Sequence, residues 1–112
     1  MNLLPAEVSG TSARVAGQEI ALAQQYGALT GKVELGIRPE FLRLSATEGL
    51  PATVTRIEDV GRHRIVRATV GGTPISIIAD EDARLGPDMT RVTFDPRHAN
   101  IYADDWLVEG AA

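Results

Sequence analysis

Short stretches of alternating apolar and polar residues, separated by glycine and proline, cover most of this chain of 112 residues. Val33, Leu35 and Ile37, for example, alternate with polar or small neighbours, which is the two-residue period of a half-buried strand. Alternations of this kind predict strands over residues 3–8, 13–15, 19–22, 32–37, 50–60, 64–70, 73–78 and 91–94. The pattern therefore predicts an all-β fold with frequent turns.

The segments between these strands carry turn residues. They predict a turn at 9–11, tight hairpins at Ala16-Gly17 and Gly71-Gly72, a loop over 24–31, an exposed connection at 45–49, a turn at Gly61-Arg62 and one helical turn over 79–84. From Ala103 onward the chain is acidic, and we expect an irregular segment that Trp106 and Leu107 dock against the core. We therefore place one domain at residues 1–103 and a C-terminal tail at 104–112.

The predicted strand over 50–60 changes phase along its length. Its apolar residues alternate from Leu50 to Val54, and the phase then slips to Ile57. Because side chains in a strand alternate between its two faces, such a slip indicates a bulge or a strong bend near Arg56. Small β-barrels need bends of this kind to close.

A proline corner follows the predicted strand at 32–37. Arg38 precedes Pro39 and is therefore pushed toward extended backbone angles, while Pro39 presets φ for a turn or a short helix. Glu40 falls just after the proline, where a carboxylate suits the free backbone N–H groups of a helical turn. Arg38 and Glu40 are near enough to pair with each other or with nearby backbone, and we interpret a buried or half-buried ion pair at this corner as architectural.

The same arrangement occurs a second time along the chain. A strand, a proline corner and an apolar return run from Val33 to Leu42, and again from Val92 to Tyr102 with Asp95, Pro96 and His98 at the corner. Repeated use of a common turn is one explanation. Two pseudo-repeated halves that contribute matching corners are the other.

Composition narrows the classes of function. A net charge of −4, ten arginines with a single lysine, and only five aromatic residues argue against nucleic acid as a general partner. There is no cysteine, and therefore neither a disulfide nor thiolate chemistry. No apolar run approaches the ~20 residues of a membrane-spanning helix, so we expect a soluble domain.

No catalytic motif is apparent in the sequence. The patterns G-x-x-x-x-G-K-[ST], G-x-G-x-x-G and G-x-S-x-G do not occur, so we expect no ATP hydrolysis by this chain. His63 and His98 lack metal-ligand spacing, and the cluster Asp80-Glu81-Asp82 lacks the pattern of a calcium loop. We therefore predict no catalytic, cofactor-binding or metal-binding residue.

Four arginines form the densest basic cluster: Arg56, Arg62, Arg64 and Arg67. One interpretation is ordinary charge on the solvent face of a strand. The other is a surface for an anion or a partner, because guanidinium groups pair in bidentate fashion with carboxylates and phosphates.

The first proline corner also carries a resemblance to a known family. The sequence GIRPE at residues 36–40, followed by Phe41 and Leu42, resembles the signature of the TOBE domain, the C-terminal regulatory domain of ATP-binding subunits in carbohydrate-type ABC importers. Residues 1–5, 57–61 and 94–98 resemble three further motifs of that domain in the same order. The signature residues, which we assign to structure or partner contact, are Gly36, Arg38, Pro39, Glu40, Asp59, Gly61, Asp95, Pro96 and His98.

This resemblance implies a small OB-like β-barrel or sandwich of two pseudo-repeated halves, with short helical turns at the proline corners. It implies a non-catalytic regulatory and dimerisation domain of an ABC transporter subunit that energises import of a sugar or glycerol-phosphate-like solute. ATP and Mg²⁺ would bind an upstream ATPase domain of the same parent chain. The other implied partners are a homodimer partner and, through the parent, membrane permease subunits, so the expected location is the cytoplasmic side of the inner membrane.

Two alternatives accompany this hypothesis. Related TOBE domains in molybdate systems bind oxyanions, and Ser12-Ala13-Arg14 resembles part of their motif, although Val15 replaces the expected Asn and the segment lies elsewhere in the chain. Small OB-like barrels also bind nucleic acid, which the acidic balance of this chain disfavours. The first alternative, an oxyanion- or small-ligand-binding module, is the one we carry forward.

Overall fold

Strands and two single-turn 3₁₀ helices (η) follow one another along residues 1–111, which are the residues that the computed structural model describes. In chain order they are β1 (Asn2–Val15), β2 (Gln18–Tyr26), β3 (Val33–Ile37), η1 (Pro39–Phe41), β4 (Arg43–Ser45), β5 (Leu50–Pro51), β6 (Thr53–Asp59), β7 (His63–Val70), β8 (Thr73–Asp80), β9 (Arg91–Thr93), η2 (Pro96–His98), β10 (Asn100–Ala103) and β11 (Trp106–Val108). The prediction of an all-β fold with short helical turns at the proline corners is confirmed.

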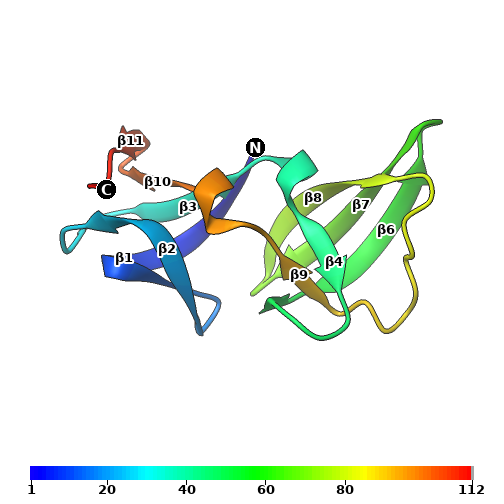
Figure 1. Ribbon diagram of the computed structural model, residues 1–112, viewed down its shortest axis with the longest axis horizontal. Coiled ribbons are helices and arrows are strands. Elements are labelled where there is room, and N and C mark those ends of the chain that lie inside the picture. The colour runs from blue at the N-terminus through cyan, green and yellow to red at the C-terminus, as the bar shows by residue number, and fades with distance from the viewer. Residues whose placement is uncertain (112) are drawn as a thin grey trace.

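These strands form two lobes, which lie side by side along the long axis of a molecule measuring 41 × 23 × 23 Å (Figure 1). The first lobe is a five-stranded sheet in the order β11-β10-β3-β1-β2. The second lobe contains two three-stranded sheets, β4-β9-β5 and β6-β7-β8. The chain passes from the first lobe to the second through η1 and returns through η2, so the two proline corners are the connections between the lobes.

Each corner is preceded by a residue in the middle strand of three paired strands. Leu35, four residues before Pro39, lies in β3 between Leu4 of β1 and Ile101 of β10. All three leucine and isoleucine side chains are buried, so this row forms the centre of the first lobe.

The second corner repeats this register. Val92, four residues before Pro96, lies in β9 between Leu50 of β5 and Leu44 of β4. The residues Leu-Pro-Ala begin at Leu4 in the first lobe and at Leu50 in the second. The repeated register supports two pseudo-repeated halves over simple reuse of a common turn.

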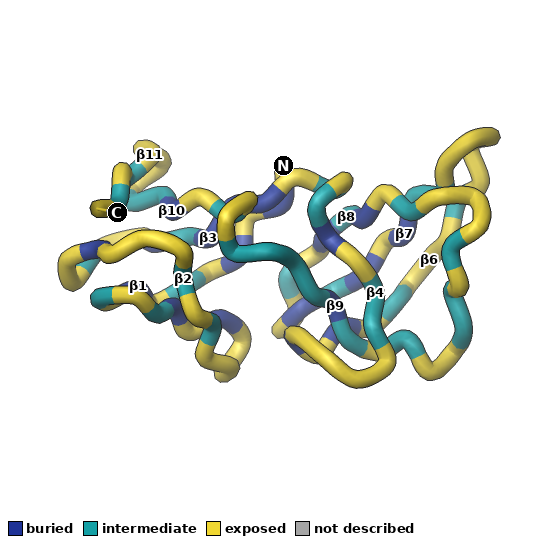
Figure 2. The backbone as a smooth tube through the Cα atoms, viewed as in Figure 1, coloured by how far each residue is buried: buried dark blue, intermediate teal, exposed yellow. Residues whose placement is uncertain are grey.

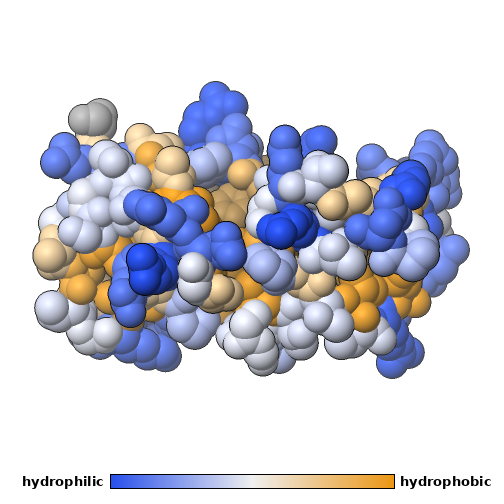
Figure 3. Space-filling view, turned by 90° about the horizontal axis from the view of Figure 1, so that it is seen from below, coloured by the Kyte–Doolittle hydropathy of each residue, from blue (hydrophilic) through white to orange (hydrophobic). Residues whose placement is uncertain are grey.

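One hydrophobic core runs through both lobes. Buried aliphatic residues from every sheet belong to a single contiguous cluster, in which Leu35, Ile37 and Val66 are fully inaccessible to solvent. The buried segments follow the inner faces of the sheets (Figure 2), and on the outside apolar surface lies between hydrophilic side chains over both lobes (Figure 3). Because the lobes share this core, separating them would expose apolar surface.

The predicted turn at 9–11 is wrong, because β1 continues through it as one long strand. Gly10 has φ of +62°, and the pairing of β1 with β2 shifts register between Gly10 and Ser12. The glycine therefore marks a bulge, at which β1 bends away from β3 and toward β2. The residues before the bend pair with β3 and those after it pair with β2.

The loop predicted at 24–31 is wrong in its first part, because β2 extends to Tyr26. Tyr26 is buried in the core, and Gln25 exchanges two backbone hydrogen bonds of 2.8 Å with Ala111 near the other end of the chain. The helical turn predicted at 79–84 is instead a β-turn, closed by the N–H of Ala83 and the carbonyl of Asp80 at 3.0 Å.

Two further expectations concern the region after residue 103. The segment is not irregular, because β11 pairs with β10. Trp106 and Leu107 do not dock on the core, since they are 79% and 56% exposed. Asp104 and Asp105 form the connecting turn with positive φ, and the backbone and ammonium of Lys32 bond to both. The domain boundary at residue 103 stays a prediction.

Candidate functional site

The two proline corners have nearly the same backbone geometry. Arg38, before Pro39, has φ −72° and ψ 147°, and Asp95, before Pro96, has φ −79° and ψ 123°. These extended values follow from the clash between a proline ring and the preceding residue. The predicted restriction of Arg38 is therefore confirmed.

Each corner is closed by two hydrogen bonds in equivalent positions. In the first, the N–H groups of Phe41 and Leu42 donate to the carbonyls of Arg38 and Pro39 at 3.0 and 3.4 Å. In the second, the N–H groups of residues 98 and 99 donate to the carbonyls of residues 95 and 96 at 3.0 and 3.1 Å. Both are single 3₁₀ turns that start at a proline, where the missing N–H costs no hydrogen bond.

The corners also contact each other. The rings of Phe41 and His98, each the last residue of its 3₁₀ turn, stack with centroids 4.0 Å apart and planes 8° from parallel. His98 is exposed at the surface, while Phe41 is half-buried and packs against the core. The signature residue His98 therefore joins the two connections between the lobes.

The charged residues of the two corners differ. The carboxylate of Asp95 accepts hydrogen bonds from the backbone and the guanidinium of Arg97, with a shortest distance of 2.7 Å. These bonds lower the pKa of Asp95 to about 2 and raise the pKa of Arg97. The side chain of Asp95 thus caps its own turn.

The expected buried pair of Arg38 and Glu40 does not form. Both residues are exposed, and the described part of the chain, 1–111, contains no ion pair between them. The 3₁₀ turn directs the two side chains into solvent, so they are free for a partner. Their role in partner contact stays a prediction.

Gly36 is needed for close packing in front of the first corner. A Cβ atom at this position would lie 2.6 Å from Cε2 of Tyr102, and 3.0 and 3.2 Å from side-chain atoms of Met1 and Leu3. The tyrosine ring therefore covers the glycine across the pair of β3 and β10, an arrangement that any side chain at 36 would disturb.

Asp59 and Gly61 lie away from the corners, at the turn between β6 and β7. The N–H of Gly61, whose φ is +99°, donates to Oδ1 of Asp59 at 3.0 Å. The sequence motif at 57–61 thus builds a hairpin turn, and the structure does not bring it together with the other signature residues (Figure 1).

Three arginines of the cluster, Arg56, Arg64 and Arg67, have partners within the chain. Arg56 and Arg67 lie 3.2 and 3.8 Å from the carboxylate of Glu58. Arg64 donates to the carbonyls of Asp80 and Ala83 and so holds the turn after β8. These contacts favour structural roles for the cluster over a general anion-binding surface.

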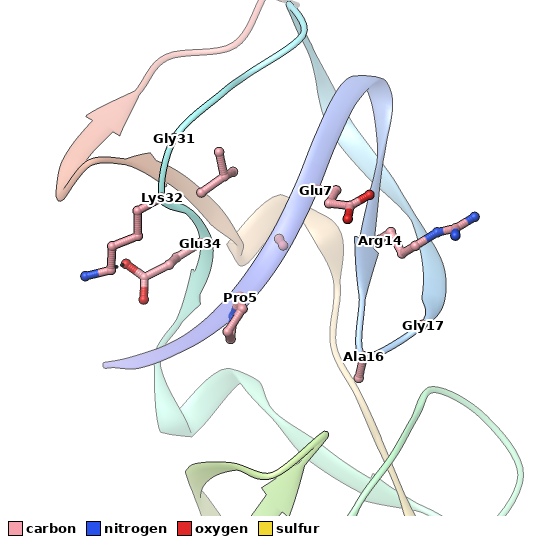
Figure 4. A pocket seen from close by; sticks show the side chains of 10 residues that line it. Pro5, Glu7, Arg14, Ala16, Gly17, Gly31, Lys32 and Glu34 are labelled. Atoms are coloured by element: carbon pink, nitrogen blue, oxygen red, sulfur yellow. Dashed lines mark ion pairs between the residues drawn. The ribbon is translucent and has the colours of Figure 1, made fainter.

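A cavity of about 460 Å³ opens where β1 bends away from β3 (Figure 4). Arg14, from the segment that resembles an oxyanion motif, lines it together with Lys32. Glu7 and Glu34 line it as well, and Nζ of Lys32 lies 3.6 Å from Glu34. Two cations are thus matched by two carboxylates, which removes the net attraction that an oxyanion needs.

One residue that sequence reasoning missed is Asn2. Its side-chain amide accepts from the N–H of Ser76 at 2.7 Å and donates to the carbonyl of Ser76 at 2.8 Å. Asn2 is the buried polar residue of the core, so its amide pairs with β8 as a neighbouring strand would. In the sequence, Asn2 is visible as a polar residue within an apolar run. That pattern does not identify its partner Ser76, which lies 74 positions away.

Within residues 1–111, we find neither a glycine-rich loop that leads into a helix nor a cluster of metal-ligating side chains. Gly71-Gly72 joins β7 to β8 as a tight turn, with φ of +55° and +82°, and it does not lead into a helix that could hold a phosphate. Within residues 1–111, no group of three or more His, Asp or Glu side chains could hold a metal ion. The same residues include no helix long and apolar enough to cross a membrane.

The fold and the site define an all-β domain whose signature residues build connections and turns. Comparison with known proteins is more specific: the TOBE domain family matches residues 35–101, which is more than half of the chain. The chain therefore belongs to the TOBE domain family.

Three relatives carry names that describe ATP-binding proteins. The chain is 36% identical over 92 residues to an uncharacterized ABC transporter ATP-binding protein, y4oS, of Sinorhizobium fredii, covering 78% of this chain and 24% of the relative. It is 34% identical over 113 residues to sn-glycerol-3-phosphate import ATP-binding protein UgpC 1 of Rhizobium johnstonii, and 27% identical over 106 residues to UgpC of a Jannaschia species. These two alignments cover 94% of this chain but 31% and 30% of the relatives, so the chain spans less than a third of their length.

Proposed function

We propose that this chain is a non-catalytic regulatory and dimerisation domain of the ATP-binding subunit of an ABC importer. The observation that carries the proposal is the TOBE family match together with relatives that are named as ABC transporter ATP-binding proteins. The parent would bind ATP and Mg²⁺ in a separate ATPase domain. It would work with membrane permease subunits at the cytoplasmic side of the inner membrane and import a sugar or glycerol-phosphate-like solute.

The fold suits such a role because its two lobes are held together as one unit that an ATPase domain could carry. The lobes share one core and are joined by two corners whose rings stack at 4.0 Å. An attached domain of this kind keeps a partner subunit at high effective concentration while the ATPase domains open and close. A partner or ligand that binds the domain differently in the two states could shift that equilibrium.

A domain exchange tests the proposal. In the UgpC 1 protein of Rhizobium johnstonii, the aligned segment would be deleted or replaced by this chain, and ATP-dependent dimerisation and sn-glycerol-3-phosphate uptake would be measured. We expect the deletion to lose dimerisation and uptake and the replacement to restore both. Full activity of the deletion would show that the domain neither dimerises nor regulates, and ATP hydrolysis by the isolated chain would show that it is an enzyme.

The alternative of an oxyanion-binding module is separated from this proposal by calorimetry. Molybdate, tungstate and phosphate titrated into the chain should give no heat of binding, because the cavity beside Arg14 and Lys32 is balanced by carboxylates. Saturable heat that disappears in an Arg14→Ala variant would support the alternative.

A further inference from the structure

The strand β6 presents an open edge at the end of the second lobe. It is an outer strand of the sheet β6-β7-β8, and no strand within residues 1–111 pairs with its other side. Ile57 and Val60 are 45% and 56% exposed, and apolar surface is visible over this lobe in Figure 3. Long open edges with exposed apolar residues readily pair with another strand, and proteins that do not use them usually block them.

The direction of the free backbone groups of β6 can be read from its hairpin. The N–H of Val60 donates to the carbonyl of His63 at 3.0 Å, so these two residues form a hydrogen-bonded pair. Because antiparallel pairs alternate, Glu58 and Arg56 also point their N–H and C=O groups toward β7. Ile57 and Asp59 therefore direct their backbone groups outward, away from the sheet.

Thr55 ends this outward series. The pairing of β6 with β7 shifts register between Val54 and Arg56, which leaves Thr55 as the extra residue of a bulge. Its hydroxyl donates to the carbonyl of Arg67 at 3.1 Å and fixes the bulge. The row of outward backbone groups thus comprises residues 57 and 59 and ends at the bulge.

The sequence of β6 is complementary to itself in one antiparallel register. If Ile57 lies opposite the partner's Ile57, then Arg56 lies opposite the partner's Glu58 and Glu58 opposite the partner's Arg56. The two Ile57 residues then form the central backbone pair, and Thr55 of each copy lies opposite Asp59 of the other. A register centred one residue earlier or later would place two arginines or two glutamates against each other, which is unfavourable.

The surroundings of Ile57 can take an apolar partner. A cavity of about 510 Å³ lies beside β6, and Ile57 lines it together with Leu85, Pro87 and Met89. Two copies related by a twofold axis through Ile57 would place these residues of both copies under the joined strands. Arg56 and Glu58 of both copies would lie on one face of the joined strands, and the two Ile57 side chains on the other.

We propose that β6 pairs with β6 of a second copy of this chain, in the register centred on Ile57, and joins the two sheets into one. This inference rests on the proposed function, because it names the surface through which the domain dimerises. The contact is isologous, so it closes at two copies and leaves no free strand edge at this end.

Single cysteines test the register, because the chain has none of its own. Opposite residues in a hydrogen-bonded antiparallel pair have Cα atoms about 5.5 Å apart, which is within the reach of a disulfide. Ile57→Cys should therefore form a covalent dimer on mild oxidation. Thr55→Cys should dimerise only when mixed with Asp59→Cys, and Ala23→Cys, on the exposed outer strand β2, serves as the control. No dimer with Ile57→Cys, or no more dimer from the mixture of Thr55→Cys and Asp59→Cys than from Ala23→Cys, would overturn the proposal.

Charge reversal gives a second, reversible readout by sedimentation of the 112-residue chain. Arg56→Glu should weaken dimerisation about tenfold, because it sets like charges opposite each other twice. The double variant Arg56→Glu with Glu58→Arg should restore it, with circular dichroism confirming the fold of each. Unchanged dimerisation in the single variant would refute pairing through β6. If these variants do not change dimerisation but the domain exchange gives the expected result, dimerisation uses another surface and the proposed function stands. If the deletion itself keeps activity, the proposed function fails.

Discussion

Asn2 links the two lobes through its side chain, and its removal is the most direct test of how they are held together. Its amide forms hydrogen bonds of 2.7 and 2.8 Å with both backbone groups of Ser76, and the residue is only 6% exposed. In Asn2→Ala, the partly buried N–H and C=O of Ser76 lose their partner. We therefore expect a loss larger than that of two exposed hydrogen bonds.

The magnitude follows from the two bonds and the groups that they leave behind. Each bond contributes about 0.5–1.5 kcal/mol net, and a buried group left unpaired costs about 1–3 kcal/mol. We expect the free energy of unfolding to fall by about 2–4 kcal/mol, a large fraction of a total of about 5–15 kcal/mol. At about 4 °C per kcal/mol, the melting temperature should fall by about 8–16 °C.

Urea unfolding followed by circular dichroism measures this change. Asn100→Ala is the matched control, since Asn100 lies exposed on β10 and should cost less than about 0.5 kcal/mol. Equal effects of the two substitutions would show that the amide does not hold the lobes.

A second variant at the same position separates the hydrogen bonds from packing. Asn2→Asp keeps the shape of the side chain but sets a carboxylate against the carbonyl of Ser76, so burial should raise its pKa above that of the unfolded chain. The folded state then binds more protons, and the variant should gain stability as the pH falls through the folded pKa. If it is as stable at neutral pH as in acid, the donor half of the contact is not needed.

Three further changes test other parts of the structure. Gly49→Ala should destabilise the fold by more than about 3 kcal/mol, or prevent folding, because Gly49 has φ of +102° and an added Cβ would lie 2.0 Å from the carbonyl oxygen of Val92. Urea unfolding measures this loss, and a mild effect would contradict the register of β5 and β9. A double-mutant cycle of Phe41→Ala and His98→Ala should give a coupling of about 0.5–1.5 kcal/mol in the free energy of unfolding. Additive losses of stability in the two single variants would mean that the ring stack does not stabilise the fold. The carboxyl of Asp95 should titrate by NMR with a midpoint of about 2. Because this pKa is depressed in the folded state, the contribution of Asp95 to stability is present above about pH 4 and is lost as the pH falls toward 2. A midpoint near 4 would show that the cap is open in solution.

The sequence predicted the features that are determined by neighbouring residues. Pro39 and Pro96 restrict the residues before them, and both corners form as expected. The slip in apolar phase near Arg56 corresponds to the observed register shift in β6. These predictions succeed because the proline ring and the alternation of side chains act within a few residues.

The errors arise where distant residues decide the structure. Gln25 is in a strand because it pairs with Ala111, a contact that no local pattern reports. Gly10 has the signature of a turn, but the partners of β1 on two sides convert it into a bulge. Trp106 was expected to be buried because it is large and apolar, yet it follows a tight aspartate turn that places it at 79% exposure.

The contacts between the lobes also explain why the charged residues of the two corners contribute little to the stability of the fold. The lobes are held by a shared core, the stacked rings of Phe41 and His98, and the buried amide of Asn2. The ion pairs at the corner and hairpin surfaces are exposed, and such pairs contribute only about 0–1 kcal/mol each. Charges such as Arg38 and Glu40 can therefore differ without loosening the joint between the lobes. Substitutions at these exposed charges should therefore leave the shared core, the ring stack and the Asn2 amide contact in place.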